Sequence, residues 1–93
     1  MIRSFRHAGL KRFFEEGKRK GIPSEMVTRI ERRLAALDDA RSAADLRQFP
    51  GFKVHPMAGG RKRDWAVWVT GNWRLTFRFA GEDVVDVNLE DYH

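Results

Sequence analysis

The fold is decided by residues 65–79, which read WAVWVTGNWRLTFRF. Two runs rich in β-branched and aromatic residues flank the dipeptide Gly71-Asn72. Such runs on either side of a two-residue turn are a strong signal for a β-hairpin. The sequence therefore predicts antiparallel strands over residues 65–70 and 73–79.

The turn also sets the register of these two strands. A two-residue loop pairs Thr70 with Trp73, and directly opposed residues share a face of the sheet. One face is therefore predicted to meet helices and the other to display arginines. The first face carries Trp68, Trp73, Leu75, Phe77 and Phe79, and the second carries Val67, Val69, Arg74, Thr76 and Arg78.

Two further strands extend the hairpin. Residues 52–56 are predicted to form one, with Pro56 at its end or at the edge of the sheet. Residues 84–89 form the other, after a turn at residues 81–83. If that turn is a three-residue loop, the core face gains Val85, Val87 and Leu89, Asp86 opposes Arg78, and Glu90 falls near Arg74.

Residues before position 50 carry a helical pattern. The apolar stripe of Leu10, Phe13 and Phe14 predicts a helix over residues 8–16, which Gly17 ends. A second helix is predicted from Pro23 to Leu37. Its buried stripe is Met26, Ile30, Leu34 and Leu37, and its solvent side carries Arg29, Arg32 and Arg33.

The two ends of this helical half complete the fold. Residues 2–5 alternate in polarity and predict a short strand, and residues 42–45 resemble the capping box of a short helical turn. The expected fold class is α+β, in which the N-terminal strand and a helical hairpin pack on one face of an antiparallel sheet. The 93 residues leave room for a single domain, 1–93.

Composition narrows the class of protein. The chain has no cysteine, which excludes disulfide scaffolds and thiol chemistry, and no apolar run long enough for a membrane helix. It carries no signal-peptide pattern, so we expect a cytoplasmic protein. Residues 1–50 carry 12 basic and 7 acidic groups, which accounts for the whole net charge of +5. Such a charge is typical of polyanion binders, although solubility alone explains it equally well.

Several side chains are candidates for chemistry. The sequence ends in Asp91-Tyr92-His93, which offers a carboxylate, a phenol and an imidazole directly after a strand. A frayed polar tail is the competing interpretation. His55 is either structural or catalytic, and Arg74 either solvated or a phosphate ligand. The histidine spacing fits no metal motif, so neither a metal nor a cofactor is expected.

Basic residues are the candidates for contacts with a phosphate backbone. Each cluster is either an ordinary hydrophilic turn or a set of contacts to a phosphate backbone. The three tryptophans are interpreted as core residues rather than as platforms for bases. The candidate contacts are Lys18, Arg19, Lys20, Arg61, Lys62, Arg63 and Arg78.

The whole chain also resembles a known family. The motifs that carry the resemblance include residues 1–7, residues 9–14, His55-Pro56, residues 71–77 and the closing residues 91–93. They are similar to those of the HigB toxins, which belong to the RelE superfamily of bacterial toxin–antitoxin systems. Relatives often carry a leucine and a lysine after the His-Pro pair, where this chain has Met57-Ala58. The role of that lysine would fall to Arg61 or Lys62.

The resemblance implies a RelE-like fold and a ribosome-associated endoribonuclease that cuts mRNA in the A site. It also implies a HigA-like antitoxin with a helix-turn-helix, and contact with operator DNA only through that antitoxin. Attack by the substrate's own 2′-hydroxyl needs no metal. His55 and His93 could then act as base and acid, Arg74 as the cation on the phosphate, Asp91 as base or orienting group, and Tyr92 as stacking group or proton donor.

Two other classes of function compete with this interpretation. The chain could be a non-catalytic module that binds RNA or the ribosome through its basic helices. It could also be an inactive toxin homologue that serves only as an antitoxin or repressor partner. A pure binder would need its basic residues but not His55, Asp91 or His93, whereas a nuclease would need these three for turnover.

Overall fold

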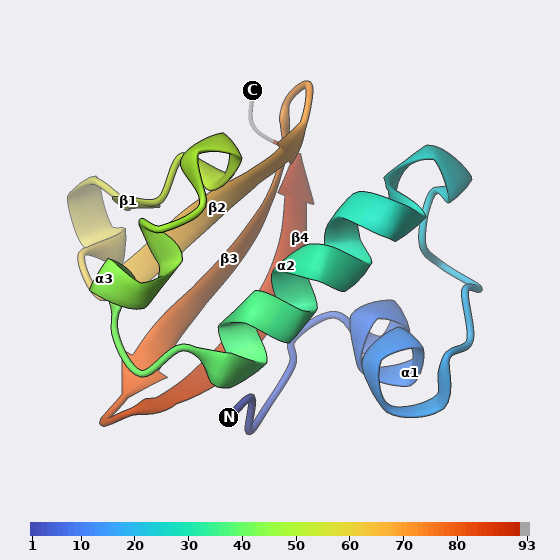
Figure 1. The fold of residues 1–93 in the computed structure, drawn as a ribbon, viewed down its shortest axis with the longest axis horizontal. Coiled ribbons are helices and arrows are strands. Elements are labelled where there is room, and N and C mark those ends of the chain that lie inside the picture. The colour runs from blue at the N-terminus through green and yellow to red at the C-terminus, as the bar shows by residue number, and fades with distance from the viewer. Residues whose placement is uncertain (92–93) are drawn as a thin grey trace.

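The computed structural model describes residues 1–91 and shows a four-stranded antiparallel sheet in the order β1-β2-β3-β4. Helices α1 and α2 cover one face of this sheet (Figure 1). This arrangement confirms the expected α+β class. The helices are α1 (Ala8–Glu16), α2 (Val27–Asp39) and α3 (Ala43–Leu46), and the strands are β1 (His55–Pro56), β2 (Asp64–Thr70), β3 (Trp73–Ala80) and β4 (Asp83–Asp91). Single 3₁₀ turns lie at Ser24–Met26, Pro50–Phe52 and Gly59–Arg61.

Helix α1 begins and ends where the sequence predicts. At its start, the Nδ1 atom of His7 accepts a hydrogen bond from the amide of Leu10 at 3.0 Å. Burial lowers the pKa of His7, which favours the neutral imidazole that this bond requires. At its end, Gly17 adopts a left-handed conformation with φ of 72°, and its amide donates to the carbonyl of Phe13.

Helix α2 buries the predicted apolar stripe and also buries one arginine of the side that was predicted to face solvent. A 3₁₀ turn precedes the helix and supplies Met26 to the stripe. Arg29 and Arg32 are exposed, as expected, but Arg33 is only 6% exposed, so its placement in solvent was wrong. The cause lies in β2, whose carbonyls at Trp68 and Val69 accept hydrogen bonds from the Arg33 and Arg29 guanidinium groups.

Arg29 and Arg33 donate hydrogen bonds to β2 beyond the part of that strand with which β1 pairs. Strand β1 pairs with β2 at Trp65 and Ala66 and does not reach further along it. The guanidinium of Arg33 also lies over the Phe52 ring, with 4.6 Å from Cζ to the ring centroid. Together with Arg29, Arg33 therefore ties α2 to the edge of β2. Desolvation lowers the pKa of Arg33, but a guanidinium in a protein remains charged.

The hairpin turn matches the prediction, but the register beyond it does not. Thr70 pairs with Trp73 as expected, whereas Val67 pairs with Leu75 because Val69 is an extra residue on β2. This β-bulge moves Val67 and Val69 into the core, where both are fully buried. It also moves Trp68 to the face that carries Arg74, so the predicted faces of these three β2 residues were wrong. The predicted faces of β3 are correct.

Strand β4 contains a second bulge. Ala80 pairs with Asp83, so the turn has two residues rather than three. Asp86 is the additional residue and has a φ of 56°. As a result, Val84 is buried with Val87 and Leu89, and the predicted core position of Val85 was wrong. The expected proximity of Glu90 to Arg74 is confirmed, since the two residues pair. Arg78 pairs with Val85, so the prediction that Asp86 opposes Arg78 was wrong, although the side chains of Arg78 and Asp86 form a salt bridge at 3.0 Å.

The remaining short segments are partly as predicted. Residues 2–5 make isolated parallel bridges to β4 rather than a strand. Of the strand predicted over residues 52–56, only His55–Pro56 is extended in the sheet, at its edge, and Phe52 instead caps the core from a 3₁₀ turn. The short helix α3 forms, but without the predicted capping box. The Ser42 side chain makes no capping hydrogen bond, and the Asp45 carboxylate accepts from the amide of Arg41 instead.

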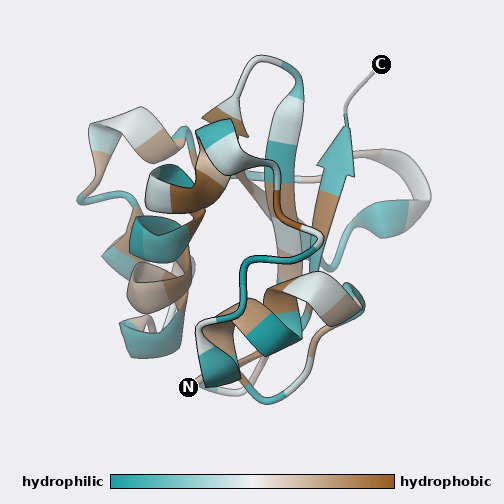
Figure 2. Cartoon of the chain, turned by 90° about the vertical axis from the view of Figure 1, so that its right-hand side faces the viewer, coloured by the Kyte–Doolittle hydropathy of each residue, from teal (hydrophilic) through white to brown (hydrophobic). Residues whose placement is uncertain are grey.

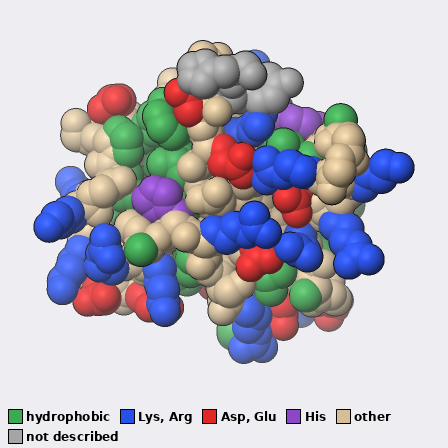
Figure 3. Space-filling view, turned by 180° about the vertical axis from the view of Figure 1, so that it is seen from behind, with side chains coloured by type: hydrophobic (Ala, Val, Ile, Leu, Met, Phe, Trp, Pro, Cys, Tyr) green, Lys and Arg blue, Asp and Glu red, His purple; other side chains and the backbone are tan. Residues whose placement is uncertain are grey.

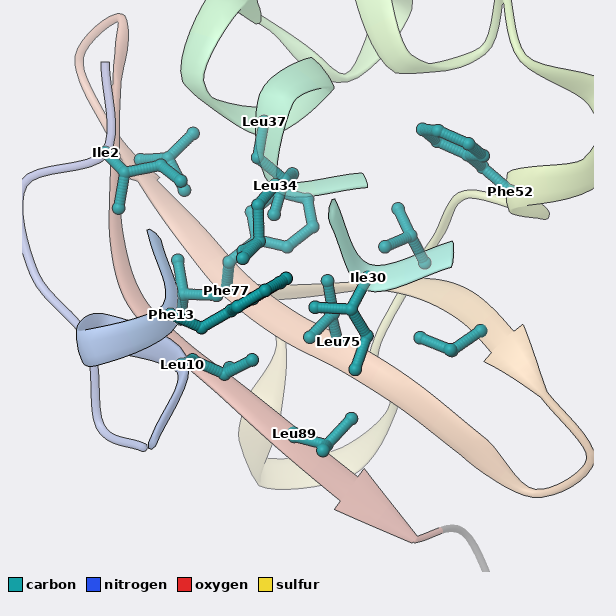
Figure 4. Close-up of a cluster of buried hydrophobic side chains, with 14 of the residues drawn as sticks. Ile2, Leu10, Phe13, Ile30, Leu34, Leu37, Phe52, Leu75, Phe77 and Leu89 are labelled. Carbon is teal, nitrogen blue, oxygen red and sulfur yellow. The ribbon is translucent and has the colours of Figure 1, made fainter. Parts of the chain in front are cut away.

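The core lies between the helices and the sheet. Apolar residues from α1, α2 and the strands point into this layer (Figure 4), while hydrophilic segments face outward (Figure 2). Phe77, Leu75, Leu10 and Ile30 are among its fully buried side chains. Within residues 1–91, no helix combines the length and the apolar character needed to cross a membrane.

Candidate active site and basic face

The face of the sheet that the helices leave open carries charged side chains. The register puts Trp68, Arg74 and Glu90 in one row across β2, β3 and β4. His55 and Thr76 are both paired with Ala66, from either side, in the neighbouring row. Lysines and arginines alternate with carboxylates over this face in the view from behind (Figure 3).

His55 and Arg74 meet at a small hollow at the hairpin end of this face. The hollow has a volume of about 210 Å³ and is lined by His55, Trp68, Gly71, Asn72, Trp73 and Arg74. Nδ1 of His55 lies 2.9 Å from the carbonyl oxygen of Lys53. Because a carbonyl only accepts, Nδ1 must be the donor, and Nε2 of the neutral ring is then left as an acceptor. His55 is thus in the tautomer that can take up a proton at Nε2.

The other predicted catalytic residues are Asp91, which ends β4, and the two residues that follow it in the sequence. Asp91 pairs with Trp73, which itself lines the hollow. The register therefore brings the main chain of Asp91 next to the wall of the site. Tyr92 and His93 lie outside the described residues, so their predicted roles stay predictions.

An ion-pair network lies beside Arg74. The guanidinium of Arg61 binds both carboxylate oxygens of Glu90, at 2.8 and 2.7 Å, and also Asp64 at 3.0 Å. The hydroxyl of Thr76 donates to Glu90 as well. The Arg61 hydrogen bonds, with smaller contributions from Thr76 and Arg74, lower the pKa of Glu90 to about 2. The same carboxylates raise the pKa of Arg61 above its usual value.

This network changes the interpretation of Arg61. Its two salt bridges hold the loop after β1 across the open face, against β4. The guanidinium is thus already engaged by carboxylates, and Lys62 and Arg63 are the exposed cations of this loop. A role for Arg61 in binding RNA remains a prediction. In the structure, Arg61 joins its loop to β2 and β4 through Asp64 and Glu90.

Four of the seven predicted RNA contacts lie together. Arg61, Lys62, Arg63 and Arg78 line a groove of about 620 Å³ on the open face. Arg6 lines the same groove and was not among the predicted contacts. Its position follows from the bridge that pairs Phe5 with Val87 of β4, which the sequence pattern did not reveal.

The other three predicted contacts lie elsewhere. Lys18, Arg19 and Lys20 belong to the connector after α1, at the opposite end of the molecule from β1 (Figure 1). Lys18 pairs with Glu16 at 3.2 Å, and Arg19 lies beside the gap between α1 and α2. These cations therefore form a second basic surface on the helical layer.

Two residues near the hollow were missed by the sequence analysis. Lys53 has a φ of 49°, and its Nζ lies over the Trp68 ring, 4.5 Å from the ring centroid. Trp68 was assigned to the core because the bulge could not be foreseen. The available signal for Lys53 was its position two residues before His55.

A sheet with helices on one face and a basic, histidine-bearing opposite face agrees with the fold of RelE-like toxins, the class to which the matching family model belongs. The model of the RelE-like toxin of type II toxin–antitoxin system HigB matches residues 3–93, and the chain belongs to this HigB-like toxin family. It is 46% identical over 94 residues to the Endoribonuclease HigB of Proteus vulgaris, covering 100% of both chains. It is 29% identical over 93 residues to Toxin HigB-1 of Vibrio cholerae serotype O1, covering 99% of this chain and 98% of the relative. Membership in a type II system implies an antitoxin partner.

Proposed function

We propose that this protein is an endoribonuclease toxin that cuts mRNA on the ribosome and so stops translation. The observation that carries the proposal is that His55 and Arg74, which lie 19 positions apart in the sequence, line one hollow on the open face. The full-length likeness to a relative named as an endoribonuclease supports the same reaction.

The proposed reaction is an intramolecular transesterification at one phosphodiester of the RNA. The 2′-hydroxyl oxygen attacks the adjacent phosphorus, the bond from phosphorus to the 5′-oxygen breaks, and the products are a 2′,3′-cyclic phosphate and a 5′-hydroxyl. His55 takes the proton of the 2′-hydroxyl at Nε2, the atom left as an acceptor by its bond to Lys53. Arg74 stabilises the charge that develops on the phosphate. This chemistry requires neither a metal nor another cofactor.

The remaining roles fall to the end of the chain. We assign the proton for the departing 5′-oxygen to His93 or Tyr92, and the orientation of an imidazole, or an alternative base function, to Asp91. The pairing of Asp91 with Trp73 supports this assignment, since Trp73 lines the hollow.

The ribosome is the proposed source of substrate alignment. A hollow this small and open does not by itself hold a flexible strand in line for attack. The groove of Lys62, Arg63, Arg78 and Arg6, together with the connector at residues 18–20, supplies cations for ribosomal RNA and message. A HigA-like helix-turn-helix protein is the proposed antitoxin, and operator DNA is contacted only through it. Such a toxin acts in the cytoplasm.

The test is induced expression without an antitoxin, followed by primer extension on ribosome-bound message. We expect growth arrest and new 5′ ends for the wild type, and neither for His55→Ala or for deletion of residues 92–93. The matched control is Lys18→Ala, an exposed cation on the other surface, which should cut with a modest, salt-dependent loss. If the wild type and the His55 variant both arrest growth without producing new 5′ ends, while the Lys18 variant does not arrest growth, the protein is a non-catalytic binding module. Normal growth with confirmed folded wild type would indicate an inactive toxin homologue.

A further inference from the structure

Trp68 is the large aromatic side chain that the bulge in β2 transfers from the core to the open face. It lines the hollow together with His55 and Arg74. Its indole nitrogen donates to the carbonyl of Gly71 at 2.9 Å, and Arg29 lies over the ring, with 5.5 Å between Cζ and the centroid. The ring is therefore held in one orientation beside the proposed reaction centre.

Lys53 covers the ring in the free protein. Its ammonium lies 4.5 Å from the ring centroid, and its carbonyl fixes the tautomer of His55. An exposed cation–π contact of this kind stabilises by only about two- to fivefold in an equilibrium constant. A nucleobase stacked on an aromatic ring contributes about 5- to 150-fold. A base can thus replace the ammonium on the ring, and the flexible lysine stem allows the ammonium to move to a phosphate.

We propose that Trp68 and Lys53 form a nucleotide-binding subsite next to His55 and Arg74, in which the indole stacks on an unpaired base of the RNA and the ammonium contacts its phosphate. This inference rests on the proposed endoribonuclease function and names the contact that positions its substrate. Trp68 is thereby a positioning residue, because its ring binds the nucleotide without touching the phosphate that reacts.

Stacking and phosphate contact have separable signatures. Stacking depends on the presence of a base and is tolerant of its identity. A phosphate contact weakens with salt, and losing one cation lowers the slope of log affinity against log salt by about one. A substrate whose base is removed but whose ribose and phosphates remain intact therefore probes Trp68 and not Lys53.

The experiment measures cleavage of one synthetic message bound to ribosomes, with each nucleotide near the cut replaced in turn by an abasic ribonucleotide. For the wild type, base removal at one position should raise the half-saturating toxin concentration about tenfold and leave the maximum rate unchanged. Trp68→Leu keeps apolar bulk without a π face. On the intact message, its half-saturating concentration should be about tenfold above that of the wild type. Base removal should not raise that concentration further. Trp68→Phe should recover most of the difference.

Two controls separate stacking from general damage. Trp65→Phe changes a tryptophan of the same strand that also has a cation nearby, Arg47 at 5.6 Å, but does not line the hollow. It should respond to base removal as the wild type does. Lys53→Gln should keep the base response and lower the salt slope by about one.

The outcomes distinguish the inference from the proposed function. If the wild type cuts the message but Trp68→Leu remains fully sensitive to base removal, the subsite is absent and Trp68 is structural. If Lys53→Gln keeps the wild-type salt slope, the ammonium does not contact a phosphate, and the proposed subsite fails in that part. If the folded wild type cuts no message, the endoribonuclease function itself fails, and the subsite for its substrate fails with it.

Discussion

The two faces of the sheet differ in what their side chains contact. On the helix-covered face, Leu75 and Phe77 are almost completely buried among other apolar groups. On the open face, their neighbours Arg74 and Arg78 lie among carboxylates and other cations. Alternate residues of one strand thus serve two purposes. Substitutions on the first face should change stability, and substitutions on the second should change activity or charge balance.

The largest expected effect is on activity and comes from Arg74. Arg74→Ala should lower the rate of mRNA cleavage by about 100- to 1,000-fold, because a preorganised cation on the phosphate is lost. The free energy of unfolding should change by about 1 kcal/mol or less, since this side chain is not in the core. Primer extension and urea unfolding measure the two quantities. A variant that unfolds more readily and cuts normally would reverse the comparison.

The neighbouring residue should behave in the opposite way. Leu75→Ala removes a fully buried side chain from the middle of β3. It should lower the free energy of unfolding by about 2–5 kcal/mol, through lost burial and the cavity left behind. Folded Leu75→Ala protein, measured at low temperature, should retain its cleavage rate. A loss of stability much below this range would show that the core relaxes around the deletion.

Glu90 tests whether charges on the open face also stabilise the fold. Its pKa is lowered to about 2, so the carboxylate binds its proton more weakly in the folded protein than in the unfolded chain. The resulting stability, about 3 kcal/mol, is present above pH 4.5 and is lost as the pH falls toward 2. Urea unfolding across this range should therefore show a steeper decline for the wild type than for Glu90→Gln. Parallel curves would mean that the Arg61 salt bridge contributes nothing to folding.

The hairpin turn gives the smallest effect. Gly71 has a φ of 54°, in the left-handed region. Asn72 does not have a positive φ, since the non-glycine residues with positive φ within residues 1–91 are Lys53 and Asp86. Gly71→Val should destabilise the fold by about 1–2 kcal/mol through backbone strain. Asn72→Val should cost about 0.5 kcal/mol. Thermal melting compares the pair, and equal losses would contradict the conformation of the turn.

The sequence predicts β3 better than β2, and the difference is physical. In β3, arginine and threonine alternate with leucine and phenylalanine, so its faces are evident from the pattern. In β2, alanine, valine and tryptophan occupy successive positions, so a shift by one residue leaves the pattern equally apolar. The bulge at Val69 therefore had no local signal. The valines before and after Asp86 concealed the second bulge in the same way.

The candidate site was predictable where it depended on residue type and not where it depended on register. Residue type made His55 and Arg74 candidates, the resemblance to the HigB toxins favoured them, and the sheet brings them to one hollow. Trp68 and Lys53 were missed because their contact depends on the bulge. Arg33 was missed because its partners are main-chain carbonyls on another element, and a helical pattern carries no information about those.

The arginines of α2 also cover part of the edge of the sheet. A strand edge with unpaired carbonyls is a template on which a second molecule can add its own strand. Here Arg29 and Arg33 occupy the carbonyls of Val69 and Trp68 beyond the reach of β1. These two contacts leave fewer carbonyls of the β2 edge available to a strand from a second molecule.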